Sequence, residues 1–164
     1  MTVHTLNEGI VQFKASIDDM IQIIETTEPD LLYKKPSEGE WSAMQIASHV
    51  IEAIRFWATD VEALLIVPGA KWGRNHEHVR RLAAVDEQVV ASLTKESAIA
   101  LLNGVKIDTE KVLNKVTEAH LKQIAPSYNP NFDRKPLFFI VDHLIIKHVE
   151  GHVEQMQRHL SKVQ

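Results

Sequence analysis

The sequence predicts an all-α fold, a four-helix bundle, in a single domain over residues 1–164. Four segments of roughly twenty residues place apolar side chains at steps of three and four, the period of an amphipathic helix. No segment alternates apolar and polar residues as a half-buried strand would. Breaks at Pro29, Pro68 and Pro136 fold the chain back on itself, which favours an antiparallel bundle over one long coiled coil.

The first helix is expected to begin at Thr5, because Thr5 and Glu8 have the spacing of a capping box. It is expected to end before Pro29, and a turn-rich stretch follows over residues 28–40. A narrow apolar stripe marks its inward face: Leu6, Ile10, Phe13, Ile17, Met20 and Ile24.

The second helix is expected to begin at a second capping box, formed by Ser42 and Gln45. The dipeptide Pro68-Gly69 predicts its end. Its inward positions are Ala43, Ile46, Val50, Ala53, Trp57, Val61 and Leu64.

The third helix is separated from the second by residues 71–85, which show no regular period and predict a long crossover containing one short helix. Thr94 has the position of an N-cap for the third helix, and Gly104 weakens this helix modestly. Its inward face carries Ala98, Leu102, Val105, Thr109, Val112 and Val116.

The fourth helix follows residues 125–136, where three prolines and two asparagines predict a loop. Pro136 suits the first turn of this last helix. One stripe of the helix runs through Leu137, Val141, Leu144, His148, His152 and Gln155.

The composition excludes several classes of function. With 45% hydrophobic and 24% charged residues, the chain is typical of globular proteins, and the absence of cysteine excludes disulfides, thiolate ligands and cysteine catalysis. The net charge of −4 and the scattered basic residues argue against nucleic-acid binding. The chain does not start with a basic region and a long apolar run, so we expect a soluble, cytoplasmic protein without membrane contact.

Three histidines, His49, His148 and His152, stand where a bundle would otherwise place apolar side chains. Residues four apart share a helix face, so His148 and His152 can reach one cation. His49 lies at the edge of the inward face of the second helix and supplies a third nitrogen. Because burial of an unpaired imidazole is costly, the three together favour a metal site. The alternative is a set of core histidines hydrogen-bonded to carbonyl groups or water.

Other patterns around these histidines carry less weight. The order H-x-E-x-H differs from the zinc-protease motif H-E-x-x-H, and Glu150 is placed about 200° around the helix from His148, so metalloprotease chemistry is not supported. His159 shares the stripe but lies about 10 Å along the axis from His152, out of reach of the same ion. The remaining histidines show no pattern that points to this ion: His4, His76, His78, His120 and His143.

Residues at a characteristic spacing carry a resemblance to a known family: Trp41, Ser42, His49, His148, His152 and Gln155. Over nearly the whole chain, the sequence resembles the DinB-like (DinB/YfiT-like) metal-binding four-helix bundles. The resemblance implies an up-down-down-up bundle that binds a divalent metal through His49, His148 and His152, often as a homodimer. For some members it also implies thiol chemistry, as S-transferases that use glutathione, mycothiol or bacillithiol. The sequence departs from the family at Lys147 and Glu154, where an acidic residue and a glycine are frequent.

A site of three neutral imidazoles leaves a fourth coordination position open, as in catalytic metal sites. Zinc or nickel is the first expectation for the ion, followed by iron or manganese. We therefore expect a metal-dependent enzyme, either a thiol S-transferase or a small hydrolase, whose partner is a small-molecule substrate such as a low-molecular-weight thiol. The alternative is a stress-related protein that binds a metal or ligand without catalysis.

Two further groups of residues are candidates for the surroundings of the ion. Glu52 and Gln155 each follow a predicted ligand by three residues and could orient it, with a solvent-facing side chain as the alternative. Arg74, Arg80 and Arg81 lie in the crossover and would bind a substrate carboxylate if the crossover covers the open side of the site. A solvated basic turn is the alternative for these arginines.

Overall fold

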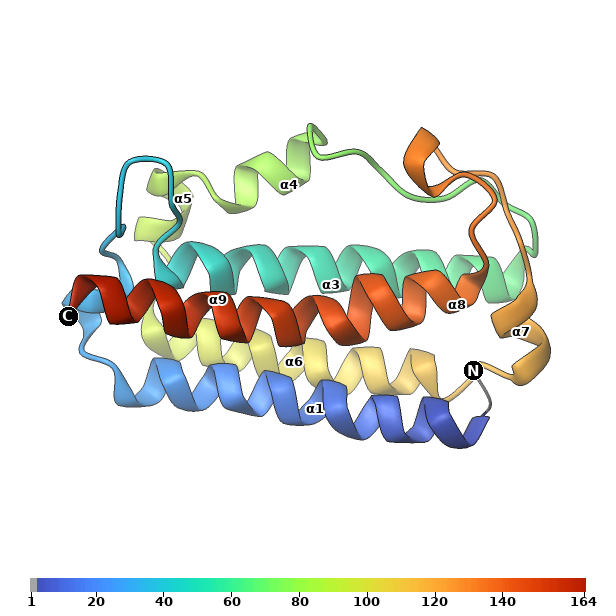
Figure 1. Ribbon diagram of the computed structural model, residues 1–164, viewed down its shortest axis with the longest axis horizontal. Coiled ribbons are helices and arrows are strands. Elements are labelled where there is room, and N and C mark those ends of the chain that lie inside the picture. The colour runs from blue at the N-terminus through green and yellow to red at the C-terminus, as the bar shows by residue number, and fades with distance from the viewer. Residues whose placement is uncertain (1–2) are drawn as a thin grey trace.

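The computed structural model describes the backbone of residues 3–164 and the side chains of residues 5–164. Its long helices pack side by side as a four-helix bundle, and this part of the chain contains no β-strand (Figure 1). The all-α prediction is therefore confirmed. The bundle consists of α1 (Val3–Thr26), α3 (Ala43–Ile66), α6 (Lys95–Leu113) and a last helix made of α8 (Leu137–Phe139), η2 (Ile140–Ile146) and α9 (Lys147–Val163).

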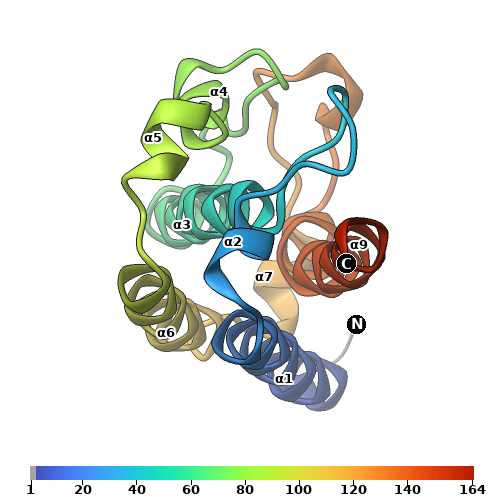
Figure 2. The ribbon, with the colours of Figure 1, turned by 90° about the vertical axis from the view of Figure 1, so that its left-hand side faces the viewer.

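The bundle has the up-down-down-up topology that the family resemblance implied. In Figure 1, α1 and the last helix run in one direction, and α3 and α6 run in the other. Both α1 and α3 contact α6 and the last helix, so the four helices stand at the corners of a square (Figure 2). Because α3 and α6 are parallel, the chain between them must return along the length of the bundle, which explains the long crossover.

The crossover lies along one side of the bundle and contains the short helix α4 (Val79–Ala84), as expected (Figure 1). Two side chains of α3 hold the end of α4. Gln45 Nε2 donates a hydrogen bond to Val85 O at 2.8 Å, and Ser48 Oγ donates one to Ala84 O at 2.5 Å. These bonds satisfy carbonyl groups that a helix end leaves unpaired, so they fix α4 against α3.

The core is formed by the apolar stripes of the four bundle helices. Every apolar position predicted to face inward is buried. Full burial of a large aliphatic or aromatic side chain contributes about 1.5–3 kcal/mol relative to exposure, so these stripes are the main source of stability. The stripe of the last helix is apolar before His148 and polar at His148 and His152, which are half-buried. Within residues 3–164, no helix is both long enough and apolar enough to cross a membrane.

Two of the predicted helix starts are confirmed and one is wrong. Ser42 caps α3 in a full capping box, in which Gln45 N donates to Ser42 Oγ at 3.1 Å and Ser42 N donates to Gln45 Oε1 at 2.8 Å. Thr94 caps α6. Thr5, however, lies inside α1, so its backbone is helical and it cannot serve as the N-cap, which needs a non-helical conformation.

The structure contains several elements that the apolar pattern did not predict. The short ones are α2 (Pro29–Leu32), α5 (Glu87–Ala91), α7 (Glu118–Lys122) and η1 (Pro130–Phe132). The largest difference is in the last helix, where Ile140–Ile146 form a π-helix in place of the expected α-helix. A π-turn holds more residues than an α-turn, so it rotates the residues before it relative to those after it.

Two glycines, one in the crossover and one in α6, provide a test of the backbone conformation. Gly73 has a φ of 88°, and a Cβ there would lie 2.7 Å from Ser127 Oγ, whereas a Cβ at Gly104 in α6 would meet no atom within 4 Å. We expect Gly73→Ala to lower the free energy of unfolding by at least about 1 kcal/mol, because L residues disfavour positive φ. Gly104→Ala should raise it by about 0.5–1 kcal/mol. Urea denaturation measures both, and changes of the same sign would contradict the assignment.

Candidate metal centre

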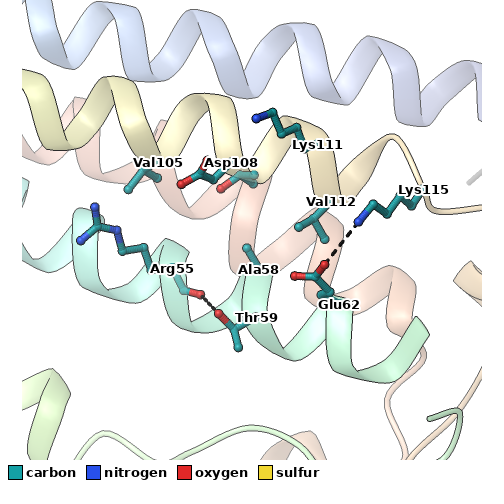
Figure 3. A pocket seen from close by; sticks show the side chains of 10 residues that line it. Arg55, Ala58, Thr59, Glu62, Val105, Asp108, Lys111, Val112 and Lys115 are labelled. Atoms are coloured by element: carbon teal, nitrogen blue, oxygen red, sulfur yellow. Dashed lines mark hydrogen bonds and ion pairs between the residues drawn. The ribbon is translucent and has the colours of Figure 1, made fainter. Parts of the chain in front are cut away.

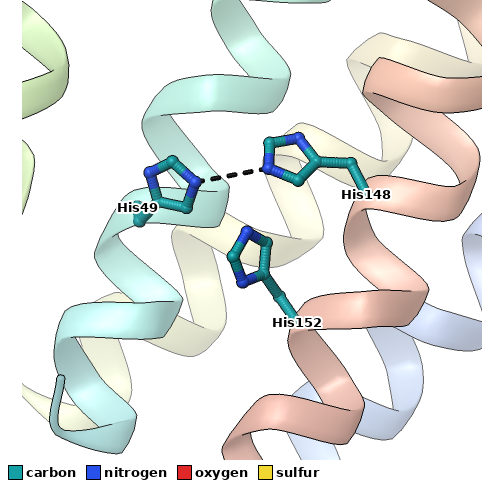
Figure 4. Close-up of side chains that lie close together, drawn as sticks. All are labelled: His49, His148 and His152. Carbon is teal, nitrogen blue, oxygen red and sulfur yellow. Dashed lines mark hydrogen bonds between the residues drawn. The ribbon is translucent and has the colours of Figure 1, made fainter. Parts of the chain in front are cut away.

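The three predicted ligands come from two neighbouring antiparallel helices. His49 lies on α3, and His148 and His152 lie one turn apart on α9, with all three rings directed toward one another (Figure 4). One nitrogen from each ring can be chosen so that the three atoms lie within 4.8 Å of one another. The structure thus brings together residues that are 99 positions apart in the sequence, and the group could hold a metal ion.

The spacing of one pair of ring nitrogens matches the spacing of two ligands on a tetrahedral ion. His49 Nε2 lies 3.3 Å from His148 Nε2, and the three ring centroids are 4.7 to 5.3 Å apart. Zinc binds imidazole nitrogen at about 2.0–2.1 Å, and a tetrahedral angle then separates two ligand nitrogens by about 3.3–3.4 Å. The separation of the His49 and His148 nitrogens therefore leaves the space that such an ion needs.

Hydrogen bonds to the outer nitrogens orient two of the rings. His148 Nδ1 donates to Leu144 O at 3.0 Å, and His152 Nδ1 donates to Gln155 Oε1 at 2.7 Å. A neutral imidazole protonated at Nδ1 carries its lone pair on Nε2, so both rings present Nε2 as a potential ligand. His49 Nδ1 is buried and has no hydrogen-bond partner among the described residues, so protein atoms alone do not satisfy this ring.

The environment keeps the three histidines neutral. Burial, followed by the nearby His152 and His148, lowers the pKa of His49 to about 2. Burial also lowers the pKa of His148 to about 4, with a further contribution from His152, while the hydrogen bond to Leu144 opposes the shift. The pKa of His152 is lowered by burial as well, and Gln155 opposes this. Neutral imidazoles at physiological pH have free lone pairs, which metal binding requires.

The three histidines line one wall of a cavity of about 430 Å³, which we call the triad cavity. Its apolar wall is formed by Ala53, Trp57, Phe132 and Leu144. Its polar wall comes from the crossover, the loop before the last helix and the π-helix: Arg74, Asn75, His76, Arg81, Asn129 and His143. The ring of Trp41 lies 5.1 Å from that of His49 and 6.5 Å from that of His152.

A second hollow of about 440 Å³ lies between α3 and α6 (Figure 3). Charges of both signs line it, and Lys115 Nζ lies 3.3 Å from Glu62 Oε1 there. None of the predicted ligands contributes to this hollow. The triad cavity is therefore the candidate functional site.

The structure distinguishes between the two residues that were expected to orient a metal-binding histidine. Gln155 accepts a hydrogen bond from His152 as expected, whereas the carboxylate of Glu52 forms a two-point ion pair with Arg74. Glu150 is exposed, in agreement with its placement away from the predicted ligands. His159 is also separate, because its Nδ1 donates to Trp41 O at 2.7 Å.

Two histidines that the sequence set aside, His76 and His143, line the triad cavity. α-Helical spacing places His143 off the stripe, but residues Ile140–Ile146 form a π-helix, in which the residues are rotated relative to an α-helix. His76 lies in the crossover, whose path no periodic pattern predicts. The neighbouring His78 caps α4, with Nδ1 accepting from Arg80 N at 3.3 Å.

Comparison with known proteins agrees with the fold and the resemblance described above. The chain belongs to the DinB superfamily, which matches residues 12–156. The structure of YfiT from Bacillus subtilis, described as a probable metal-dependent hydrolase with an unusual four-helix bundle topology, matches this one with a TM-score of 0.81. The match has 14% sequence identity and covers 99% of this chain and 89% of YfiT, so it shows the shared fold. Among curated proteins, no significant match was found.

The buried histidines predict a pH dependence of stability in the metal-free protein. Between the pKa of about 2 for folded His49 and about 6.5 for an unfolded histidine, the unfolded chain binds more protons than the folded one. Stability should therefore fall as the pH drops below about 6.5, and His49 alone should contribute about 1 kcal/mol per pH unit. Urea midpoints at pH 7, 6 and 5 in the presence of a chelator measure this. His49→Gln should show a shallower decline, and an equal decline would contradict the prediction.

Proposed function

We propose that the protein is a metal-dependent enzyme that binds one divalent ion through the Nε2 atoms of His49, His148 and His152. The observation that carries the proposal is the convergence of three neutral imidazoles on one point in the wall of the triad cavity. The description of YfiT as a probable metal-dependent hydrolase supports it. Zinc or nickel suits this ligand set first, with iron or manganese as the alternatives.

Each of the surrounding groups has a separate task. The Leu144 carbonyl and the Gln155 side chain hold His148 and His152 in the orientation that directs Nε2 inward. Trp41 packs against two of the rings and restricts their movement. The apolar wall of the triad cavity shields a bound molecule from water. A divalent ion held by the three imidazoles would have an open position and would act there as a Lewis acid, which would make a water- or thiol-derived nucleophile available near neutral pH.

The reaction that we propose first is hydrolysis of a small molecule. Thiol S-transfer is the second reaction that the same site would support, and the thiol must then come from the substrate because the chain has no cysteine. A volume of about 430 Å³ lies within the usual range of small-molecule sites, which supports a small-molecule partner. A homodimer and a cytoplasmic location stay predictions.

Metal analysis of untagged protein tests the ligand assignment. We expect about one equivalent of divalent metal in the wild type and its loss in His49→Ala, His148→Ala and His152→Ala, since two imidazoles hold an ion far more weakly than three. His159→Ala is the matched control, because this buried histidine lies on the same helix outside the triad, and it should retain the metal. Stoichiometric metal in all three triad variants would reject the proposal.

Activity assays on the same preparations distinguish the reactions. Metal-loaded and chelator-treated protein are compared with p-nitrophenyl esters for hydrolysis, and with low-molecular-weight thiols plus monochlorobimane for thiol transfer. Metal-dependent turnover of the esters supports a hydrolase, and metal-dependent conjugation supports a transferase. A stoichiometric metal complex that accelerates neither reaction would favour the non-catalytic binding protein.

The Gln155 side chain provides a test of ligand orientation. Gln155→Leu removes the acceptor for His152 Nδ1, so we expect metal affinity to fall about 10–100-fold, as is usual when such supporting groups are removed. Glu154→Leu is the control, because Glu154 is exposed and directly precedes Gln155 on the same helix. Competition with a fluorescent zinc chelator measures both affinities. Equal affinity of the two variants would show that Gln155 does not support the ion.

A further inference from the structure

The triad cavity has an uncompensated positive charge. Among the described residues that line it, none is an aspartate or a glutamate, and two are arginines. A divalent ion on the three histidines would add two more positive charges to the same space. The two arginines differ in whether the protein itself supplies a counterion.

Arg74 is neutralised within the protein. Its Nη1 and Nη2 atoms donate to the two carboxylate oxygens of Glu52 at 2.7 and 2.5 Å, and its guanidinium lies over the ring of Phe56, 4.1 Å from the centroid. Its side chain is only 3% exposed. A two-point ion pair of this kind holds the guanidinium in place and uses its charge, so Arg74 is a fixed part of the wall.

Arg81 carries no such counterion. Its Nη1 donates to the backbone oxygen of His76 at 3.1 Å, and no carboxylate among the described residues lies within ion-pair distance of it. Its guanidinium carbon lies 6.0 Å from the centroid of the Trp41 ring, next to the histidines. Burial, followed by the nearby Arg74, lowers the pKa of Arg81, and the charge of Glu52 opposes this shift without forming an ion pair with Arg81. An arginine stays charged at neutral pH.

The position of Arg81 is fixed by the packing of α4. The Gln45 and Ser48 bonds to the end of α4 attach this helix to α3, at positions four residues and one residue before His49. The guanidinium is therefore held near the proposed ion without a carboxylate counterion of its own. A partly buried cation is costly in that state, and an anion from a ligand would compensate it.

We propose that the triad cavity takes a small carboxylate, whose anionic group is bound by Arg81 while its apolar body packs against Trp57, Phe132 and Leu144. A single free guanidinium matches one negative charge and the planar geometry of a carboxylate. The assignment of this carboxylate as a substrate rests on the proposed function, whereas its binding does not. Arg81 is then the residue that determines specificity, distinct from the residues that hold the ion.

The proposal predicts a preference for an anion over a neutral molecule of the same shape. The probes are 2-naphthoate and 2-naphthamide, titrated by calorimetry into metal-free protein so that a carboxylate cannot simply bind the ion. The wild type should bind 2-naphthoate about tenfold or more tightly than 2-naphthamide, because the amide lacks the charge-assisted bonds. In Arg81→Gln the two probes should bind equally, and Arg81→Lys should keep part of the preference.

Arg80→Gln is the matched control. Arg80 is the preceding residue of α4 and is exposed outside the triad cavity, so its removal changes the net charge equally and should leave the preference intact. A wild type without preference, or a preference that survives Arg81→Gln in a variant with a normal thermal melt, would overturn the inference. Metal content measured on untreated portions of the same preparations, before the metal is removed for calorimetry, separates the two proposals. Loss of the anion preference with full metal binding rejects only the role of Arg81, and absence of metal with an intact preference rejects only the metal-dependent enzyme.

Discussion

The antiparallel contact between α3 and the last helix is the constraint on which the rest of the structure depends. It places His49 opposite His148 and His152 in a seam that is otherwise formed mainly by buried apolar side chains. A slip of one helical turn, about 5.4 Å, would move the rings beyond joint reach of any ion. The apolar packing therefore fixes the geometry of the site as well as the stability of the bundle.

Burial of the imidazoles has two opposite effects. It suppresses protonation, so protons do not compete for the nitrogen lone pairs near neutral pH. It also removes the rings from water, and His49 Nδ1 finds no replacement partner in the protein. Under the proposed function a cation binds the inward Nε2 atoms, which are different from this Nδ1, so that folding and metal binding stabilise each other.

Much of the bundle and the three converging histidines could be predicted from the sequence, because both follow from helical periodicity. The stripes that end in Ile24 and Leu64 identified buried faces, and the spacing of His148 and His152 placed two rings on one face. Helical periodicity did not predict His143 correctly, because the backbone around it is π-helical and not α-helical. His143 therefore lines the triad cavity although α-helical spacing places it elsewhere.

Contacts between side chains that are distant in the sequence could not be predicted from helical periodicity either. Glu52 was a reasonable candidate for orienting His49, but it pairs with Arg74 across the crossover. In the sequence the three arginines of that segment were equivalent. Only the structure shows that Arg74 forms an ion pair, that Arg80 faces solvent and that Arg81 has no carboxylate partner. Such choices depend on the path of an irregular segment.

The three histidines and the other polar residues of the triad cavity come from different kinds of segment, and this has an evolutionary consequence. The three histidines stand on long helices locked into the core, whereas Arg74, Arg81 and Asn129 come from the crossover and from the loop before the last helix. Substitutions or insertions in those two segments can change ligand selectivity while the three histidines and the helices that carry them stay unchanged. A fold arranged in this way is suited to diversification, in which related chains keep one reactive centre and acquire different substrates.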